Sequence, residues 1–241
     1  MKPSAPLSAL APALAAALAL SASPLFGQDG WPVFDSSEVQ PPGQGLSFTA
    51  RYPPAFTRSP QAPVPDAAPA AGQAGGEELS EADRGRPPAP LQFFFGEIPG
   101  TGKRVTMQAV LGRLRPDDKE LMEYFGPEDY WEAMGQEMGR GLGSFRGAKP
   151  FEFRGRRAAD LNYDWSRKDE DGGERTYLSV RRSVMAGDAL ISLVCTLRAP
   201  SSDVRAEGLR PGEGPDFSRY CTPFLESLAL DEKGSRPGVR Q

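Results

Sequence analysis

Reactive side chains are scarce in this chain of 241 residues, which has two cysteines and no histidine. Without histidine it lacks Ser-His-Asp and Cys-His catalysis, histidine-rich metal sites and the commonest general base at neutral pH. Adjacent carboxylates at 117–118, 128–129 and 169–171 stand at expected helix starts and in a turn, where acidic residues are favoured for structural reasons. We therefore predict a protein that is not an enzyme and that has no catalytic residue, metal site or cofactor.

Two short motifs resemble ligand-binding loops without completing them. In residues 96–103 (GEIPGTGK) the outer glycine is one residue too far from the Gly-Lys pair, and Arg104 follows where a phosphate-binding loop needs Ser or Thr. Residues 169–172 (DEDG) lack the twelve-residue calcium loop with its terminal bidentate glutamate. We expect a turn between two strands at the first motif and a solvated hairpin turn at the second.

Arginine on neighbouring expected strands is the remaining candidate for a binding function. Scattered surface arginine is the structural alternative to a docking patch for an acidic partner. Because the net charge is −4 and basic residues alternate with acidic ones, we expect no nucleic-acid partner. The candidate docking patch consists of Arg154, Arg156, Arg157, Arg181 and Arg182.

The first 27 residues have the pattern of a cleaved secretory signal peptide. Lys2 gives the short positive region, and an Ala/Leu-rich run over residues 7–20 is interrupted by Pro12 and is shorter than a membrane span needs. No later segment is apolar enough to span a membrane. We therefore expect a periplasmic or secreted bacterial protein with no membrane span after cleavage.

Export to an oxidising compartment favours a disulfide between Cys195 and Cys221 over a metal site. Two buried free thiols and a redox-active pair are the alternatives, and the absence of a Cys-x-x-Cys spacing argues against the redox pair. Cys195 falls on the apolar side of an alternating strand, and Cys221 falls on the apolar face of the last helical pattern. Both patterns direct the sulfurs into one sheet–helix interface, with a Cα–Cα distance below about 7 Å.

Beyond the signal peptide the sequence indicates a single domain over residues 46–230. An extended segment (28–45) precedes it, and a short frayed tail (231–241) follows it. The domain contains a Pro/Ala/Gly-rich insertion at 59–90 that is predicted to be disordered, because it has too few large apolar side chains to offset its ordering entropy.

Period-2 alternation predicts most of the domain to be β-strand. The last three strands are joined by short turns, which predicts an antiparallel meander. The predicted strands are 46–52, 91–95, 104–111, 149–153, 157–166, 176–185 and 187–198.

Two stretches have helical spacing instead. The first begins at residues 116–118, is interrupted at Gly126-Pro127 and continues with an apolar stripe that includes Trp131 and Met134. The second spans residues 217–228, where Pro223 either kinks the helix or begins a new segment. A Gly/Pro-rich loop is expected before it, from 200 to 215.

The order of these elements over about residues 45–230 resembles the PsbP-like superfamily, which includes a Ran-binding nuclear-import factor and bacterial envelope proteins of the DcrB type. The features that match are the small-residue start of a strand at 155–163, the strand at 190–200 that ends in a proline-linked loop, and the terminal helix at 217–228. The insertion and Pro223 depart from the usual pattern. The resemblance implies an antiparallel sheet with a helix on each face, in a family that mostly binds or assists other proteins, and no catalytic residue carries over.

The expected fold class is α+β, an antiparallel β-sheet of about six to seven strands packed between a helix pair from the N-terminal half and a C-terminal helix. The expected function is that of an exported non-enzymatic module that binds a protein partner in the cell envelope or supports an envelope assembly. The alternative is a small-molecule or lipid carrier with a pocket between the sheet and the helices, lined by Trp131, Met134 and phenylalanines.

Overall fold

The computed structural model describes residues 30–40, 46–60, 89–114, 117–169 and 171–231. The expected signal peptide (1–27), all but the ends of the insertion and nearly all of the tail lie outside these residues. The strand β3 (Thr57–Ser59) and the strand β4 (Ala89–Ile98) flank the insertion and pair with each other at the edge of a sheet.

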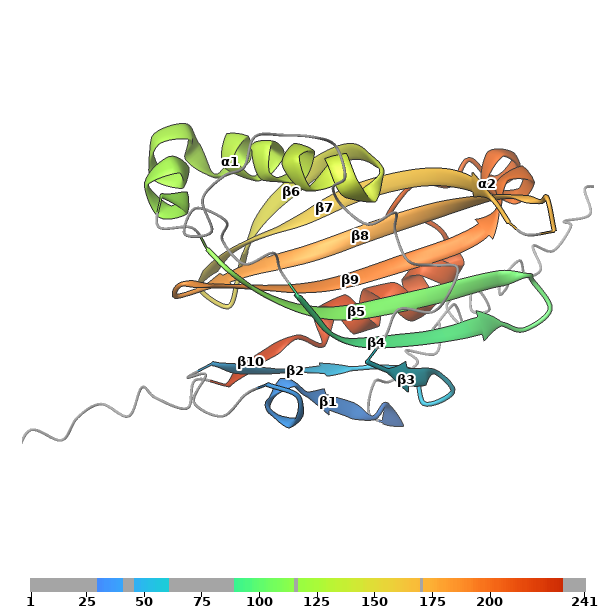
Figure 1. The fold of residues 1–241 in the computed structure, drawn as a ribbon, viewed down its shortest axis with the longest axis horizontal. Helices are drawn as coiled ribbons and strands as arrows, with labels where there is room; N and C mark the ends of the chain where they lie inside the picture. Colours follow the sequence, from blue (N-terminus) through green and yellow to red (C-terminus); the bar gives the residue numbers. More distant parts are fainter. Residues whose placement is uncertain (1–29, 41–45, 61–88, 115–116, 170, 232–241) are drawn as a thin grey trace, which may run out of the picture.

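A seven-stranded antiparallel sheet in the order β3-β4-β5-β9-β8-β7-β6 forms the centre of the molecule (Figure 1). The alternating apolar residues that predicted these strands line one face of β5, β8 and β9, so hydrophobic burial fixes their register. Gly187, with φ of 68°, makes the tight turn between β8 and β9. The other strands are β5 (Lys103–Arg113), β6 (Ser144–Phe153), β7 (Arg156–Lys168), β8 (Glu174–Ala186) and β9 (Ala189–Pro200).

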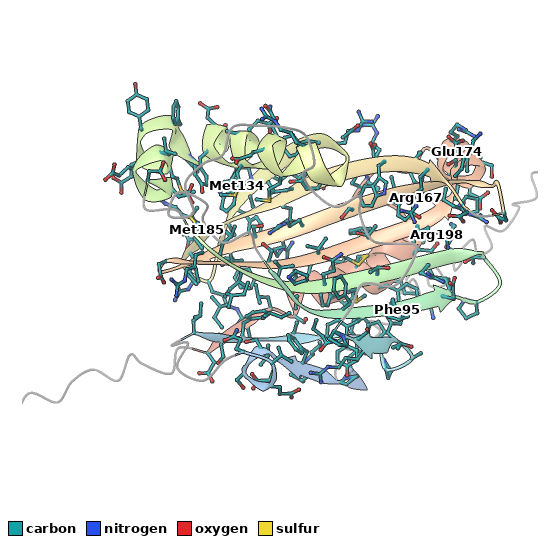
Figure 2. All side chains as sticks on the ribbon, in the orientation of Figure 1. Phe95, Met134, Arg167, Glu174, Met185 and Arg198 are labelled. Atoms are coloured by element: carbon teal, nitrogen blue, oxygen red, sulfur yellow. A yellow bond between two sulfur atoms is a disulfide. The ribbon has the colours of Figure 1, made fainter. Side chains whose placement is uncertain are left out.

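The helix α1 (Asp118–Leu142) covers β6 and β7 on one face of this sheet (Figure 1). It consists of the two segments expected from the sequence, because Gly126 has a φ of 83° and Pro127 begins the second segment. The second segment lies close to the sheet at Gly135, where a Cβ atom would be 2.3 Å from Cε2 of Phe145. Met134 lies on the side of α1 that faces the sheet (Figure 2).

The C-terminal helical region covers the opposite face. A π-helical turn, η3 (Phe217–Cys221), continues into α3 (Thr222–Glu226), so Pro223 stands in the first turn of α3, where its missing N–H does no harm. The structure has a disulfide between Cys195 on β9 and Cys221 on η3, with the Cα atoms 5.5 Å apart. The expected fold class, an α+β sheet between helices, is therefore confirmed.

Two features of the fold were not expected. The predicted strand at 46–52 is β2 (Ser47–Arg51), but it belongs to a separate three-stranded sheet with β1 (Val33–Asp35) and β10 (Ala229–Asp231). The expected loop at 200–215 contains a two-turn helix, α2 (Ser201–Glu207). β1, β10 and α2 were missed because three to seven residues are too few to establish a period.

Candidate binding site

The five arginines of the predicted docking patch do not form one strip. Arg154 and Arg156 border Gly155 in the turn between β6 and β7, and Arg157 follows on β7. Arg181 and Arg182 are consecutive residues of β8, so their side chains point to opposite faces of the sheet. The patch prediction was therefore wrong for these two residues. Arg154, Arg156 and Arg157 lie together at the hairpin, although Arg156 and Arg157 are also consecutive strand residues and start toward opposite faces.

Arg182 is held within the structure and is not a free docking group. Its guanidinium donates to both carboxylate oxygens of Asp160, with Nε–Oδ1 and Nη2–Oδ2 distances of 2.8 Å. It also lies over the ring of Phe151, 5.0 Å from the centroid. A bidentate pair of this kind fixes both side chains, so Arg182 supports the sheet face below the C-terminal helix.

A cleft separates the second segment of α1 from the β6–β7 hairpin. The volume of the cleft is about 520 Å³, and both Arg156 and Arg157 are among its lining residues. The kink at Gly126 places Pro127 at its edge, and the hairpin supplies the opposite wall. The cleft is lined by Pro127, Glu128, Trp131, Pro150, Phe151, Glu152, Gly155, Arg156, Arg157 and Ala158.

Trp131 of α1 is one of the residues that line this cleft. Its side chain is fully buried, and its indole Nε1–H has no hydrogen-bond partner among the described residues. The other lining residues include apolar side chains, two glutamates and two arginines. The cleft therefore suits an apolar group that has charged groups beside it.

Three exposed apolar side chains lie on the first segment of α1, which precedes the cleft residues Pro127 and Glu128 in the chain. Leu121 is 38% exposed, Tyr124 83% and Phe125 53%, and the rings of Tyr124 and Phe125 meet edge to face at 4.9 Å between centroids. The sequence placed Leu121 and Phe125 on an apolar stripe, but Met122 is the residue that packs into the core. Contiguous exposed apolar residues of this size are typical of interaction surfaces.

The DEDG turn is a structural ion-pair site. The Asp169 carboxylate accepts from Arg175 Nε at 2.9 Å and also from Arg198 Nη2, which ties the β7–β8 turn to the end of β9. Figure 2 shows Arg198 and Glu174 toward this same end of the sheet. Burial by itself raises the pKa of Asp169, but the hydrogen bonds from Arg175 and Arg198 outweigh it and lower the pKa below its usual value.

Replacing Asp169 with asparagine is expected to destabilise the protein by about 2–3 kcal/mol at pH 7. Arg198 and Arg175 both lose a buried carboxylate partner, and Arg175 keeps only its longer contact with Asp171. The folded-state pKa of Asp169 is lowered, so its contribution is complete above the unfolded pKa near 4 and is lost as the pH falls through the folded value. Urea unfolding of both proteins from pH 7 to pH 3 measures this difference. A difference that stays constant down to pH 3 would contradict the assignment.

The GEIPGTGK motif forms the β4–β5 turn, as expected. Its lysine, Lys103, begins β5 and lies within ion-pair distance of Asp216 (3.1 Å) and Glu207 (3.5 Å). Burial tends to lower the pKa of Lys103, but Asp216 and Glu207 together raise it. This lysine therefore ties the turn to α2 and to the residue before η3.

Within the described ranges, no three His, Cys, Asp or Glu side chains gather in a group that could hold a metal ion. No helix in the same part of the chain is long and apolar enough to cross a membrane.

No protein-family model matches the chain, and no curated protein sequence matches it either. Among solved structures it is similar to LpqN of Mycobacterium tuberculosis, a protein involved in cell envelope biogenesis, with 12% identity, a TM-score of 0.39 and coverage of 82% of this chain and 91% of that one. It is also similar to PsbP of the cyanobacterium Synechocystis sp. PCC 6803, with 10% identity, a TM-score of 0.36 and coverage of 83% and 92%.

A protein of Bacteroides thetaiotaomicron VPI-5482 also aligns, with 10% identity and a TM-score of 0.35, over 78% of this chain and 46% of that one. At these identities and TM-scores the likeness concerns the fold and transfers no function.

Proposed function

We propose that the protein is an exported, non-enzymatic α+β module that binds a protein partner of the cell envelope through its helix–hairpin surface. This surface consists of the cleft, the exposed Leu121, Tyr124 and Phe125 of α1, and the hairpin arginines Arg154, Arg156 and Arg157. The observation that carries the proposal is the exposed Tyr124–Phe125 pair, which stands immediately before the cleft-lining residues Pro127 and Glu128 in the chain.

The surface has the layout of a protein interface. Apolar residues and a recess near the centre supply anchoring contacts, and charged side chains at the rim supply orientation. A partner with an apolar side chain for the cleft and carboxylates near it would match Trp131, Pro127 and the hairpin arginines. The disulfide between Cys195 and Cys221 supports export, because such bonds persist in oxidising compartments.

The composition of the cleft supports binding over catalysis. Glu128 and Glu152 are its only carboxylates, and the ten lining residues include no Ser, Thr, Cys, Lys or Tyr that they could activate as a nucleophile.

Changing Arg154, Arg156 and Arg157 together to glutamate is expected to weaken partner binding about 10- to 100-fold, because each rim charge contributes modestly to recognition. A photoreactive phenylalanine analogue at Tyr124 of the mature protein, crosslinked in the native cell envelope, should yield one adduct. Excess unlabelled wild-type protein should suppress this adduct, and the triple variant should not.

The matched control reverses three exposed arginines away from this surface, Arg205, Arg210 and Arg219, and should compete like the wild type. Equal competition by the two triple variants, or the absence of a reproducible adduct at Tyr124, would refute the helix–hairpin surface as the binding site.

A small-molecule or lipid carrier is the second candidate, and the observation in its favour is that Trp131 and Phe151 line a cleft between helix and sheet. Met134, the other residue named for such a pocket, does not line it. Native mass spectrometry of the protein isolated from its cells distinguishes the two functions. A stoichiometric small molecule that is lost on Trp131→Phe substitution would favour the carrier.

A further inference from the structure

Arg181, in the middle of β8, is a buried cation without a counterion. Its exposed fraction is 6%, and its Nε donates to Ser192 Oγ at 3.1 Å, whereas Nη2 has no hydrogen-bond partner. Among the described residues no carboxylate lies within ion-pair distance of it. Its neighbour Arg182 does have a counterion, because its Nε and Nη2 both donate hydrogen bonds to the carboxylate of Asp160.

Hydroxyl side chains lie on the same sheet face as Arg181, on three adjacent strands, in the rows on either side of the Arg181–Val194 pair. The register pairs Ser179 with Thr196 and Ser183 with Ser192, and Thr196 with Thr106 on β5. Two of these hydroxyl pairs are hydrogen-bonded, Ser183 Oγ to Ser192 Oγ at 2.9 Å and Thr196 Oγ1 to Ser179 Oγ at 3.0 Å. All of these hydroxyl-bearing residues are buried. We name them the hydroxyl stripe, which consists of Thr106, Ser179, Ser183, Ser192 and Thr196.

The hydroxyl stripe does not serve the hydrophobic core. The core side of the same strands is apolar, with Val180, Leu193 and Cys195 packed against the C-terminal helical region. The stripe is on the side of the sheet where α1 lies, but α1 packs on β6 and β7, and the stripe is on β8, β9 and β5 (Figure 1). The hydroxyl stripe and Arg181 lie at the centre of the sheet, where apolar side chains would stabilise the fold better. We therefore look for a role for them other than folding.

The energetics point in the same direction. Taking a guanidinium out of water without a counterion is strongly unfavourable, and removing the charge or pairing it relieves this cost. Burial lowers the pKa of Arg181, and Tyr163 provides only a weak opposing influence. A bound anion would neutralise Arg181 and accept hydrogen bonds from its Nη2 and from the stripe.

We propose that Arg181 and the hydroxyl stripe bind the carboxylate of a small organic acid. One positive charge among neutral hydroxyls matches a monoanion, and the planar guanidinium presents paired donors that fit a carboxylate. This site is separate from the helix–hairpin surface, and the two proposals stand or fall independently.

Thermal unfolding in sodium acetate and in sodium hexanoate, against sodium chloride at the same ionic strength, tests the site. The wild-type Tm should rise by about 5–10 °C at a carboxylate concentration roughly 100-fold above the dissociation constant. In Arg181→Met the rise should vanish, while the Tm without carboxylate should equal or exceed that of the wild type, because an unpaired buried charge is gone. Arg182→Met is the matched control; it should unfold at a lower temperature than the wild type and keep the full carboxylate response.

If Arg181→Met does not fold, Arg181→Lys keeps the charge without the planar fork and should lose most of the response with an unchanged circular dichroism spectrum. A wild type that does not respond, or an Arg181 variant that responds like the wild type, would overturn the proposal. The sequence has four carboxylates at Glu77, Glu78, Glu81 and Asp83. A response that arises only after these four are changed to amides would assign the carboxylate to the chain itself and would also overturn it.

Discussion

Replacing both Cys195 and Cys221 with alanine is expected to lower the free energy of unfolding by about 3–4 kcal/mol, which corresponds to a Tm lower by roughly 7–15 °C. The bond joins residues 26 apart in sequence, and in the chain-entropy model opening a loop of this length releases that much unfolded-state entropy. Both cysteines are fully buried, so no solvation of exposed side chains offsets the loss.

The bond also determines where the C-terminal helical region sits. Cys195 is on β9, the central strand of the main sheet, and Cys221 ends the π-helical turn before α3. Guanidinium unfolding of the wild type with a reducing agent should reproduce the stability of the double variant, and the agent should leave the variant unchanged. Ser202→Ala, at an exposed position, is the control. A loss below about 1 kcal/mol would contradict the chain-entropy argument.

Phe94→Ala is expected to destabilise the protein by about 3–5 kcal/mol, the range for emptying a fully buried phenylalanine site. Phe94 lies on β4 with no exposed surface and joins the two sheets to the helical region. Its ring is 5.6 Å from that of Phe34, 4.2 Å from Tyr52 and 6.3 Å from Phe224, measured between centroids. These neighbours come from three separate elements, so a cavity here cannot be filled by the shift of one of them.

Urea unfolding measures this loss, and amide hydrogen exchange locates it. Exchange should accelerate most in β1 and β2, which contact the main sheet through these rings. Phe95→Ala is the matched control, because Phe95 is the next residue of β4, faces the other side of the sheet and is only half-buried. Equal losses for the two variants would show that Phe94 has no special role in joining the sheets.

Local sequence patterns predicted the parts of the fold that depend on local physics. Alternation marks a strand because successive side chains face opposite sides, and Gly126-Pro127 marks a kink because glycine accepts positive φ and proline lacks an N–H. The same alternation could have shown that Arg181 and Arg182 do not belong to one patch. It put Leu178, Val180 and Val184 on one face, so Arg182 belongs with them and Arg181 belongs with Ser179 and Ser183.

Other features had no local signal. β1 and β10 have three residues each and exist as strands because β2 lies between them to receive their hydrogen bonds. The cleft needs Pro127 of α1 and Phe151 of β6 on opposite walls, and their separation depends on how α1 docks through Gly135. The exposure of Tyr124 and Phe125 likewise depends on that docking, since a helical stripe does not tell which turns reach the sheet.

Local sequence patterns were enough to predict the α+β fold class, the strands of the meander, the broken first helix and the position of both sulfurs in one interface. Each follows from the period of side chains along a single element or from the conformational limits of glycine and proline. Which polar groups remain without partners became visible in the three-dimensional fold. Whether Arg181 or Trp131 finds a partner depends on side chains from distant elements, and those are set by packing between elements and not by the order of residues within one.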